Sequence, residues 1–304
     1  MKHYTVPPLK TDAARRQFVK ECDLLLEQRM QDAIRSLEAL EDLRFFGLTG
    51  PTCSGKTTAA FTITRLLEAR GRAVHVISLD DFYYDKEYLH RRAEADPDIE
   101  IDYDSEQTID VSLLSEQAEN LYRGLETHIP HFDFKSGMRK GEAVIRPKEN
   151  DVFLFEGIQT LYPNVSAILD RHHTYRSLAI CPTSSIEVGG SLFEPNEIRL
   201  YRRLVRDFRH RATSPEFTFY LWQSVRANEE KNIFPNLGTC HATIDSALPY
   251  EIGMLKPYLV PLLQAIPSEN AFYGTAQGIL KKLAYVQPIP SAYMTEQSLY
   301  KEFI

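Results

Sequence analysis

The chain has 304 residues, of which 43% are hydrophobic and 25% charged, as is typical of a globular protein. Its 35 basic and 42 acidic residues give a net charge of −7, which argues against a general nucleic-acid-binding protein. No apolar run is long enough to span a membrane, the first residues lack the apolar core of a signal peptide, and the cysteines lack zinc-site or disulfide spacing. We therefore expect a cytoplasmic protein without membrane or nucleic-acid partners.

Residues 11–43 carry apolar side chains at helical spacing between charged ones, which predicts one or two amphipathic helices covering an edge of the core. We divide the chain into a helical lead-in at 1–43, a main domain at 44–265 and a C-terminal helical extension at 266–304, packed on the main domain. We find no internal repeat and no low-complexity tract.

The most informative stretch is 50–58, GPTCSGKTT, which matches the phosphate-binding pattern G-x-x-x-x-G-K-[ST]. An apolar run at 45–48 predicts a buried strand before it, and 57–70 predicts a helix after it. Glycines in such a loop let backbone N–H groups face phosphates at the positive end of a helix. We expect Lys56 to reach the outer phosphates and Thr57 to hold Mg²⁺. The predicted nucleotide contacts are Gly50, Thr52, Cys53, Ser54, Gly55, Lys56, Thr57 and Thr58, and we expect Cys53 to be unreactive.

Carboxylates follow two further predicted strands. Residues 73–79 lead to Asp80 and Asp81, and the apolar run 152–155 leads to Glu156. The carboxyl ends of parallel strands meet at one edge of a sheet, so these groups should lie near the phosphate loop. A carboxylate in that place suits Mg²⁺, and we expect Glu156, Asp80 and Thr57 at the metal.

Between these strands we predict a helix at 111–123, an extended segment at 128–134 and a basic turn or hairpin at 135–148. The acidic stretch 94–110 contains apolar residues, so part of it should pack near the site. Residues 175–180 predict another strand. Together these elements predict an α/β fold with a parallel sheet flanked by helices.

Residues 197–211 predict a helix with one basic face and one apolar stripe. The basic face consists of Arg199, Arg202, Arg203, Arg206 and Arg209. We interpret it as a lid that supplies cations to a transferred phosphoryl group, the alternative being a solvated face with surface salt bridges. Further helices are predicted at 222–231, 250–263 and 271–285.

Five segments in order resemble the uridine kinase and phosphoribulokinase family of P-loop kinases. They are 50–58, 78–83, 129–139, 155–158 and 199–211, and the resemblance covers roughly 44–265. The stretch from Trp222 to Glu251 is similar to a bacterial nucleoside-kinase-like subgroup. The resemblance implies a P-loop fold with a helical lid and C-terminal helices, and a kinase that uses ATP and Mg²⁺ to phosphorylate a hydroxyl of a small molecule.

By position, the resemblance makes Asp80 the general base, with Asp81 as the competing assignment. Its catalytic set is Asp80, Lys56, Arg206 and Arg211. Its acceptor-binding set is Tyr83, Asp104, Phe132, Arg139 and Arg203.

Three positions depart from the uridine kinase pattern. Phe132 replaces a tyrosine, Gly137 replaces a histidine, and Thr213 replaces an arginine near the nucleoside. The resemblance therefore implies retained phosphate chemistry with altered base recognition. A nucleoside is the first candidate acceptor, and a sugar, polyol or pantothenate-like alcohol the second. A non-catalytic ATP-binding module is a further alternative, a regulatory GTPase is disfavoured because guanine-binding N-K-x-D is absent, and homo-oligomerisation stays open.

Overall fold

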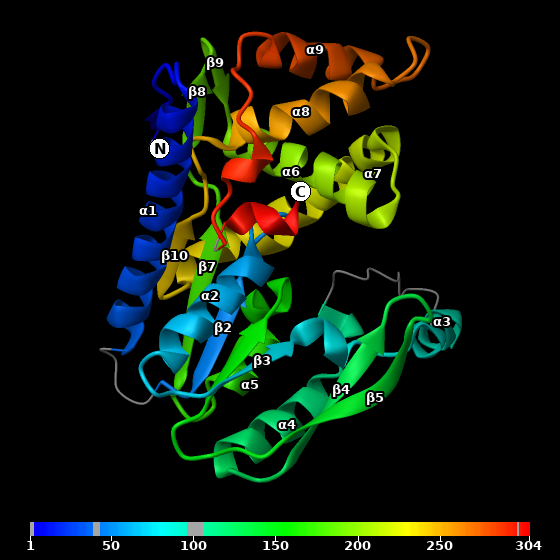
Figure 1. Ribbon diagram of the computed structural model, residues 1–304. Helices are drawn as coiled ribbons and strands as arrows, with labels where there is room; N and C mark the ends of the chain where they lie inside the picture. The colour runs from blue at the N-terminus through cyan, green and yellow to red at the C-terminus, as the bar shows by residue number, and fades with distance from the viewer. Residues whose placement is uncertain (1–2, 39–42, 96–105, 297) are drawn as a thin grey trace.

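The computed structural model describes residues 3–38, 43–95, 106–296 and 298–304 (Figure 1). Its core is a five-stranded parallel sheet with the order β10-β7-β2-β6-β3. These strands are β2 (Phe45–Thr49), β3 (Val74–Ser78), β6 (Val152–Glu156), β7 (Tyr175–Cys181) and β10 (Ala242–Asp245). The sheet confirms the predicted α/β fold.

Side chains that alternate along the strands of the sheet belong to two separate hydrophobic clusters. Phe46 and Leu154 belong to one cluster, whereas Phe45, Phe153 and Phe155 belong to the other. Because neighbouring residues of a strand point to opposite faces, the clusters lie on the two sides of the sheet. A sheet covered on both sides explains why β2 and β6 read as continuous apolar runs.

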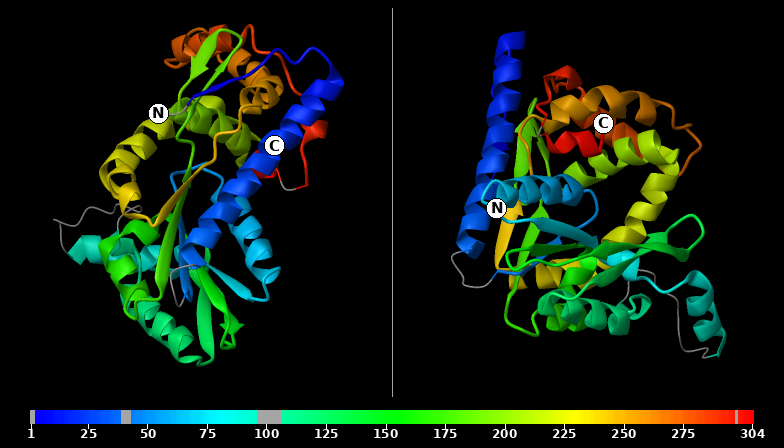
Figure 2. Two further views of the ribbon diagram at one scale, coloured as in Figure 1. Left: turned by 90° about the vertical axis from the view of Figure 1, so that its left-hand side faces the viewer. Right: turned by 60° about the horizontal axis from the view of Figure 1, so that its bottom comes forward.

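Nine α-helices lie in the described part of the chain. They are α1 (Asp12–Glu38), α2 (Lys56–Glu68), α3 (Lys86–Ala95), α4 (Val111–Arg123), α5 (Pro163–Leu169), α6 (Pro195–Arg211), α7 (Pro215–Asn228), α8 (Glu251–Gln264) and α9 (Tyr273–Leu283). Helices α1, α2, α6 and α8 contribute to the first cluster and α4 and α5 to the second (Figure 2). None of these helices has the length and apolar content that a membrane crossing requires.

Two small sheets complete the fold. Strands β4 (Thr127–Asp133) and β5 (Met138–Ile145) form an antiparallel hairpin, as the basic segment predicts. Strands β1 (His3–Thr5), β8 (Ser185–Val188) and β9 (Ser191–Phe193) form a second sheet. The chain ends in a short 3₁₀ turn, Leu299–Glu302, which lies against α2 (Figures 1 and 2).

Some predicted elements need correction. Of the one or two helices predicted at 11–43, the structure has one, at 12–38, because apolar positions such as Val19, Leu26 and Ile34 stay on one buried face throughout. The helix predicted at 222–231 begins earlier, at Pro215, and passes into a π turn at Glu229–Ile233. The three-part domain division stays a prediction, although residues from all three parts share the first hydrophobic cluster.

Candidate active site

The phosphate loop joins β2 to α2 through two glycines that no other residue can replace. Gly50 has φ 156°, and a Cβ there would lie 2.1 Å from the carbonyl oxygen of Ile180. Gly55 has φ 98°, and a Cβ would lie 2.3 Å from Leu299 Cδ1. The left-handed backbone and the close neighbours both require glycine. The loop thus has the curled form that directs N–H groups toward an anion.

Lys56 begins α2, and its ammonium lies against its own loop. Its Nζ donates to the carbonyl oxygens of Gly50 at 2.9 Å and Pro51 at 3.3 Å. The Thr57 side chain is exposed, while Cys53 is buried, and burial raises the pKa of its thiol. An unreactive thiol is therefore expected at Cys53, in line with the sequence.

Strand register brings the predicted carboxylates together. Glu156 pairs with Leu48 of β2 on one side and with Ser78 of β3 on the other. Burial raises the pKa of Glu156, Lys56 opposes this rise, and Asp80 adds to it. A half-buried carboxylate next to the phosphate loop fits Mg²⁺, because a divalent cation would compensate its buried charge.

Asp80 is held by a residue that the sequence analysis missed. Gln159 is only 1% exposed, and its Nε2 donates to Asp80 Oδ1 at 2.6 Å and to the Tyr83 hydroxyl at 2.8 Å. Its Oε1 is buried without a hydrogen-bond partner in the described residues. Gln159 lies in the short 3₁₀ turn Ile158–Leu161, three residues after Glu156. This position next to a predicted site carboxylate is the only signal in the sequence that could have indicated a role for Gln159.

Asp81 faces the hairpin instead of the phosphate loop. Its Oδ1 accepts the backbone N–H of Phe132 at 2.9 Å and lies 3.2 Å from His131 Nδ1. Burial raises the pKa of Asp81, and the Phe132 N–H and His131 oppose the rise. Asp80 lines the cleft described below, whereas Asp81 anchors β4, and this difference favours Asp80 as the base.

The basic helix α6 does not present one row of exposed cations. Arg199, 1% exposed, makes a bidentate ion pair with Glu229 at 2.6 and 2.7 Å. Arg202, fully buried, pairs with Glu251 at 2.8 Å. These two arginines are structural, which corrects the prediction of a lid face made of all five.

The same two arginines also brace the phosphate loop. Arg199 Nη1 donates to the carbonyl of Thr52 at 3.1 Å, and Arg202 Nη1 donates to those of Cys53 at 3.2 Å and Ser54 at 3.4 Å. Because the arginines bind the carbonyl groups on one side of the loop, the backbone N–H groups of the loop can face the opposite side. The N–H of Thr52 meets Glu229 Oε1 at 3.2 Å.

Three of the predicted catalytic and acceptor-binding arginines surround one carboxylate, Asp207, whose side chain is 3% exposed, whereas Arg209 of the basic face lies over the Tyr258 ring. Arg203 contacts it at 3.1 Å, Arg206 at 2.7 Å and Arg211 at 3.7 Å. Three cations around one anion leave excess positive charge. Arg203 and Arg211 also line the cleft. Asp207 is four residues from both Arg203 and Arg211, and this i,i+4 spacing in the sequence could have predicted the two ion pairs.

These groups meet in a cleft of about 730 Å³ between the phosphate loop and α7. Its lining is Thr52, Lys56, Asp80, Tyr83, Phe134, Glu156, Gly157, Ile158, Gln159, Arg203, Arg211, Val225, Asn228, Glu229 and Ile233. Predicted residues of all three kinds therefore meet in one place: phosphate-binding Thr52 and Lys56, acidic Asp80 and Glu156, and basic Arg203 and Arg211.

The acceptor-side predictions fare unevenly. Tyr83 lines the cleft, and Phe134 lines it in place of the predicted Phe132, which is 5% exposed behind it. The Arg139 guanidinium donates to the carbonyls of Phe82 and Tyr83 and to Asp110, so it fastens the loop after β3 rather than lining the cleft. Asp104 lies outside the described residues.

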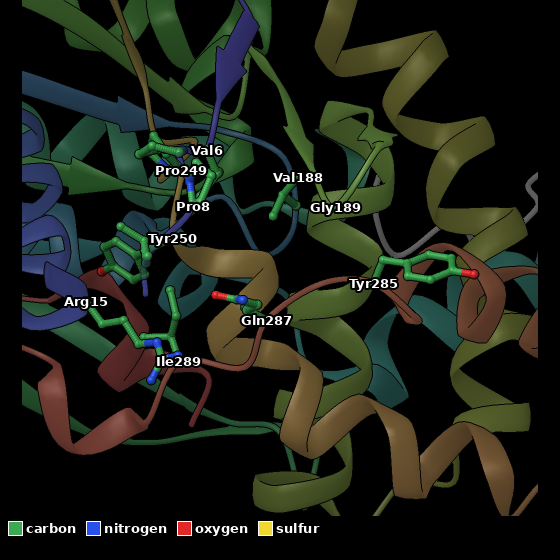
Figure 3. A pocket seen from close by; sticks show the side chains of 13 residues that line it. Val6, Pro8, Arg15, Val188, Gly189, Pro249, Tyr250, Tyr285, Gln287 and Ile289 are labelled. Atoms are coloured by element: carbon green, nitrogen blue, oxygen red, sulfur yellow. The ribbon is translucent and has the colours of Figure 1, made fainter. Parts of the chain in front are cut away.

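A separate cavity of about 200 Å³ lies between the N-terminal segment, α8 and residues 285–289 (Figure 3). Its walls are mostly apolar, with Val6, Pro8, Pro249 and Ile289 among them. It shares no residue with the phosphate loop, and its polar side chains are those of Arg15, Tyr250, Tyr285 and Gln287.

Comparisons with known proteins show which family the sequence matches. The model of the Phosphoribulokinase / Uridine kinase family matches residues 45–251. A uridine kinase of Clostridium novyi (strain NT) is 28% identical over 165 residues, which cover 54% of this chain and 68% of that protein. Uridine-cytidine kinase B of Dictyostelium discoideum is 30% identical over 177 residues, 58% of this chain and 63% of that protein.

Among solved structures, D-glycerate 3-kinase from Cryptococcus neoformans var. grubii aligns with a TM-score of 0.46 and 15% identity, covering 67% of this chain and 87% of that one. The family match extends from the first strand of the core, through the phosphate loop, to the carboxylate that pairs with Arg202. The chain belongs to the phosphoribulokinase / uridine kinase family and is a phosphotransferase with a hydroxyl acceptor.

Proposed function

We propose that this protein is an ATP- and Mg²⁺-dependent kinase of a small molecule, with a nucleoside as the first candidate acceptor. The observation that carries the proposal is the single cleft lined by Lys56, Asp80, Glu156 and Arg203. A cation for the outer phosphates, a carboxylate for the metal and a carboxylate for the acceptor hydroxyl are the parts that phosphoryl transfer requires. Curated relatives named as uridine kinases support the nucleoside.

In this proposal each residue has a defined task. Asp80, oriented by Gln159, accepts the proton of the acceptor hydroxyl. Lys56 leaves the carbonyls of Gly50 and Pro51 and pairs with the outer phosphates. Thr57 and Glu156 would hold Mg²⁺, which supplies charge neutralisation on the phosphates.

The arginines of α6 complete the electrostatics. Arg203, Arg206 and Arg211 share Asp207, so their surplus positive charge faces negative charge that develops on the transferred group. Catalysis then rests on positioning and preorganised charge rather than on covalent chemistry.

The hairpin residues next to the cleft narrow the range of acceptors that we expect. Gly137 has φ 69°, a left-handed conformation that disfavours the histidine of uridine kinases, and a Cβ there would displace the exposed Lys86 side chain, whose Cδ would lie 2.3 Å away. Phe132 and Phe134 pack edge to face at 5.2 Å beside Tyr83. Loss of two hydrogen-bonding groups removes on the order of 0.5–1.5 kcal/mol each. We therefore expect poor uridine and cytidine phosphorylation. A nucleoside with a larger base should suffer less, and a sugar, polyol or pantothenate-like alcohol stays the second class of acceptor.

A panel assay tests both parts of the proposal. ATP consumption is measured with uridine, cytidine, adenosine, guanosine and a set of sugars and polyols, for the parent and for Lys56→Ala. Consumption that depends on one acceptor and on Lys56 supports the kinase. Uridine as the best acceptor, with kcat/KM of about 10⁴ M⁻¹s⁻¹ or more, would refute the altered-acceptor expectation. Acceptor-independent binding of ATP without turnover would favour the regulatory module.

A further inference from the structure

The C-terminal turn, Leu299–Glu302, is built onto the phosphate loop. Leu299 is 1% exposed and covers Gly55, and the rings of Tyr300 and Phe303 are fully buried. Arg202 lies 5.6 Å from the Tyr300 ring centroid and 5.5 Å from that of Phe303. The same guanidinium donates to the loop carbonyls, so the turn and the loop share one buried cation and are held together.

This arrangement brings a carboxylate to the start of α2. Glu302 Oε2 lies 3.5 Å from the backbone nitrogen of Thr58 and 3.4 Å from its hydroxyl oxygen. The Thr58 N–H belongs to the first turn of the helix, where N–H groups lack intrahelical partners and attract anions. In the phosphate-loop pattern these N–H groups cradle the inner phosphates of the nucleotide. Glu302 therefore contacts donors that the proposed nucleotide would use.

Glu302 differs from the other carboxylate at the loop. Glu229 also meets a loop N–H, but Arg199 and Arg226 hold both of its oxygens. Glu302 makes no salt bridge with any residue that the structure describes, and its contacts with Thr58 are long. Glu229 is thus a fixed part of the loop, whereas the Glu302 side chain can leave while the backbone of the turn stays in place.

The charge of Glu302 also reaches the catalytic groups. It adds to the rise in the pKa of Glu156, although burial and Asp80 contribute more, with Lys56 opposing. A negative charge in this position repels the polyphosphate of a nucleotide, and it also occupies the Thr58 donors that a phosphate would use.

We propose that Glu302 is a resident competitor at the nucleotide site: its carboxylate holds Thr58 in the free protein and must leave before the phosphate nearest the nucleoside can bind. The proposal rests on the proposed nucleotide-binding function. It makes the C-terminal turn a wall of the nucleotide site and Glu302 a determinant of nucleotide affinity.

Binding measurements by calorimetry test the proposal with ATP, ADP, AMP and adenosine as titrants. Glu302→Gln keeps the shape and removes the charge, and Glu296→Gln is the matched control, since Glu296 is an exposed carboxylate of the same C-terminal segment. We expect Glu302→Gln to bind ATP, ADP and AMP roughly tenfold more tightly, because the amide no longer carries the negative charge that repels phosphate and competes for the Thr58 donors. The affinity of Glu302→Gln for adenosine, which lacks a phosphate, should equal that of the parent. The Glu296→Gln variant should bind all four titrants as the parent does.

Unchanged phosphate-dependent affinities in a Glu302→Gln variant that melts with the parent would overturn the proposal. Weaker binding of adenosine as well as ATP would also overturn it, because Glu302 would then contact the nucleoside. A folded parent that binds none of the four titrants would instead refute the nucleotide site itself, and this inference with it. Lys56→Ala separates the cases, because it should lose ATP affinity while keeping the adenosine response of the parent.

Discussion

Replacing Asp80 by asparagine tests the assignment of the base most directly. The substitution keeps the shape of the side chain, and the new amide oxygen can still accept from Gln159 Nε2, which lies 2.6 Å from Asp80 Oδ1. The fold and the affinity for ATP should therefore hold. The substitution removes the proton acceptor, and a general base typically accelerates the reaction by about 10²–10⁴-fold. We expect kcat to fall by that factor, equivalent to about 3–5 kcal/mol in the barrier.

Asp81→Asn is the matched control, because it makes the same chemical change one residue away. The new amide can still accept the Phe132 N–H, which bonds to Asp81 Oδ1 at 2.9 Å. The lost partner is His131, whose side chain is 69% exposed, so the ion pair is worth at most about 1 kcal/mol. We expect kcat within about threefold of the parent, which corresponds to less than 1 kcal/mol.

Release of ADP, measured under ATP saturation with the best acceptor of the panel, gives kcat for both variants. Calorimetry with ATP provides the control for binding. A larger kcat loss for Asp81→Asn than for Asp80→Asn would refute the geometric argument, and so would an Asp80→Asn variant within about threefold of the parent.

Three further substitutions probe the neighbours of Asp80. Lys56→Ala should abolish transfer and weaken ATP binding with an unchanged melting temperature, and turnover within about threefold of the parent would contradict the phosphate-loop assignment. Gln159→Leu should lower kcat roughly tenfold at constant KM for ATP, since it removes a charge-assisted hydrogen bond to Asp80 worth about 1.5–3 kcal/mol; partial recovery in Gln159→Asn is the check against a packing defect. Burial raises the pKa of Glu156, so its ionised form destabilises the fold above the folded-state pKa, and this cost vanishes as pH falls below the ordinary value of 4.5. Glu156→Gln should therefore melt about 2 °C higher at pH 7 if the cost is about 1 kcal/mol, converge with the parent near pH 4, and be inactive; an equal or lower melting temperature at pH 7 would contradict this reasoning.

The sequence was sufficient for the elements whose residues carry their own signal. Strands β2, β3, β6 and β7 were predictable because each is a compact run that ends at a turn residue or a carboxylate. Strand β10 was missed because only Ile244 of its four residues is fully buried, which leaves no apolar run to detect. Helix α3 was missed for a similar reason, with Leu89 as its one buried residue.

The roles of charged residues were harder to predict than their positions. Five arginines at helical spacing look alike in the sequence, but their partners lie far along the chain: Glu229 is 30 residues from Arg199, and Glu251 is 49 residues from Arg202. Only the folded sheet brings such pairs together. Gln159 was overlooked because a neutral amide next to a conspicuous carboxylate shows its function only through the atoms that it contacts.

The two groups of arginines on α6 explain why a chain of net charge −7 concentrates basic residues in one helix. Arg199 and Arg202 are each matched by a carboxylate, so they add structure to the loop without adding net charge. Leaving either buried carboxylate unpaired would cost several kcal/mol, which ties the loop to the π turn after α7 and to the start of α8. In the part of the chain that the structure describes, Arg203, Arg206 and Arg211 have only Asp207 as an ion-pair partner, and they follow Arg202 on the same helix. One rigid helix therefore fixes the shape of the phosphate loop at its first half and supplies the surplus positive charge at its second, so that charge and loop keep a constant spacing.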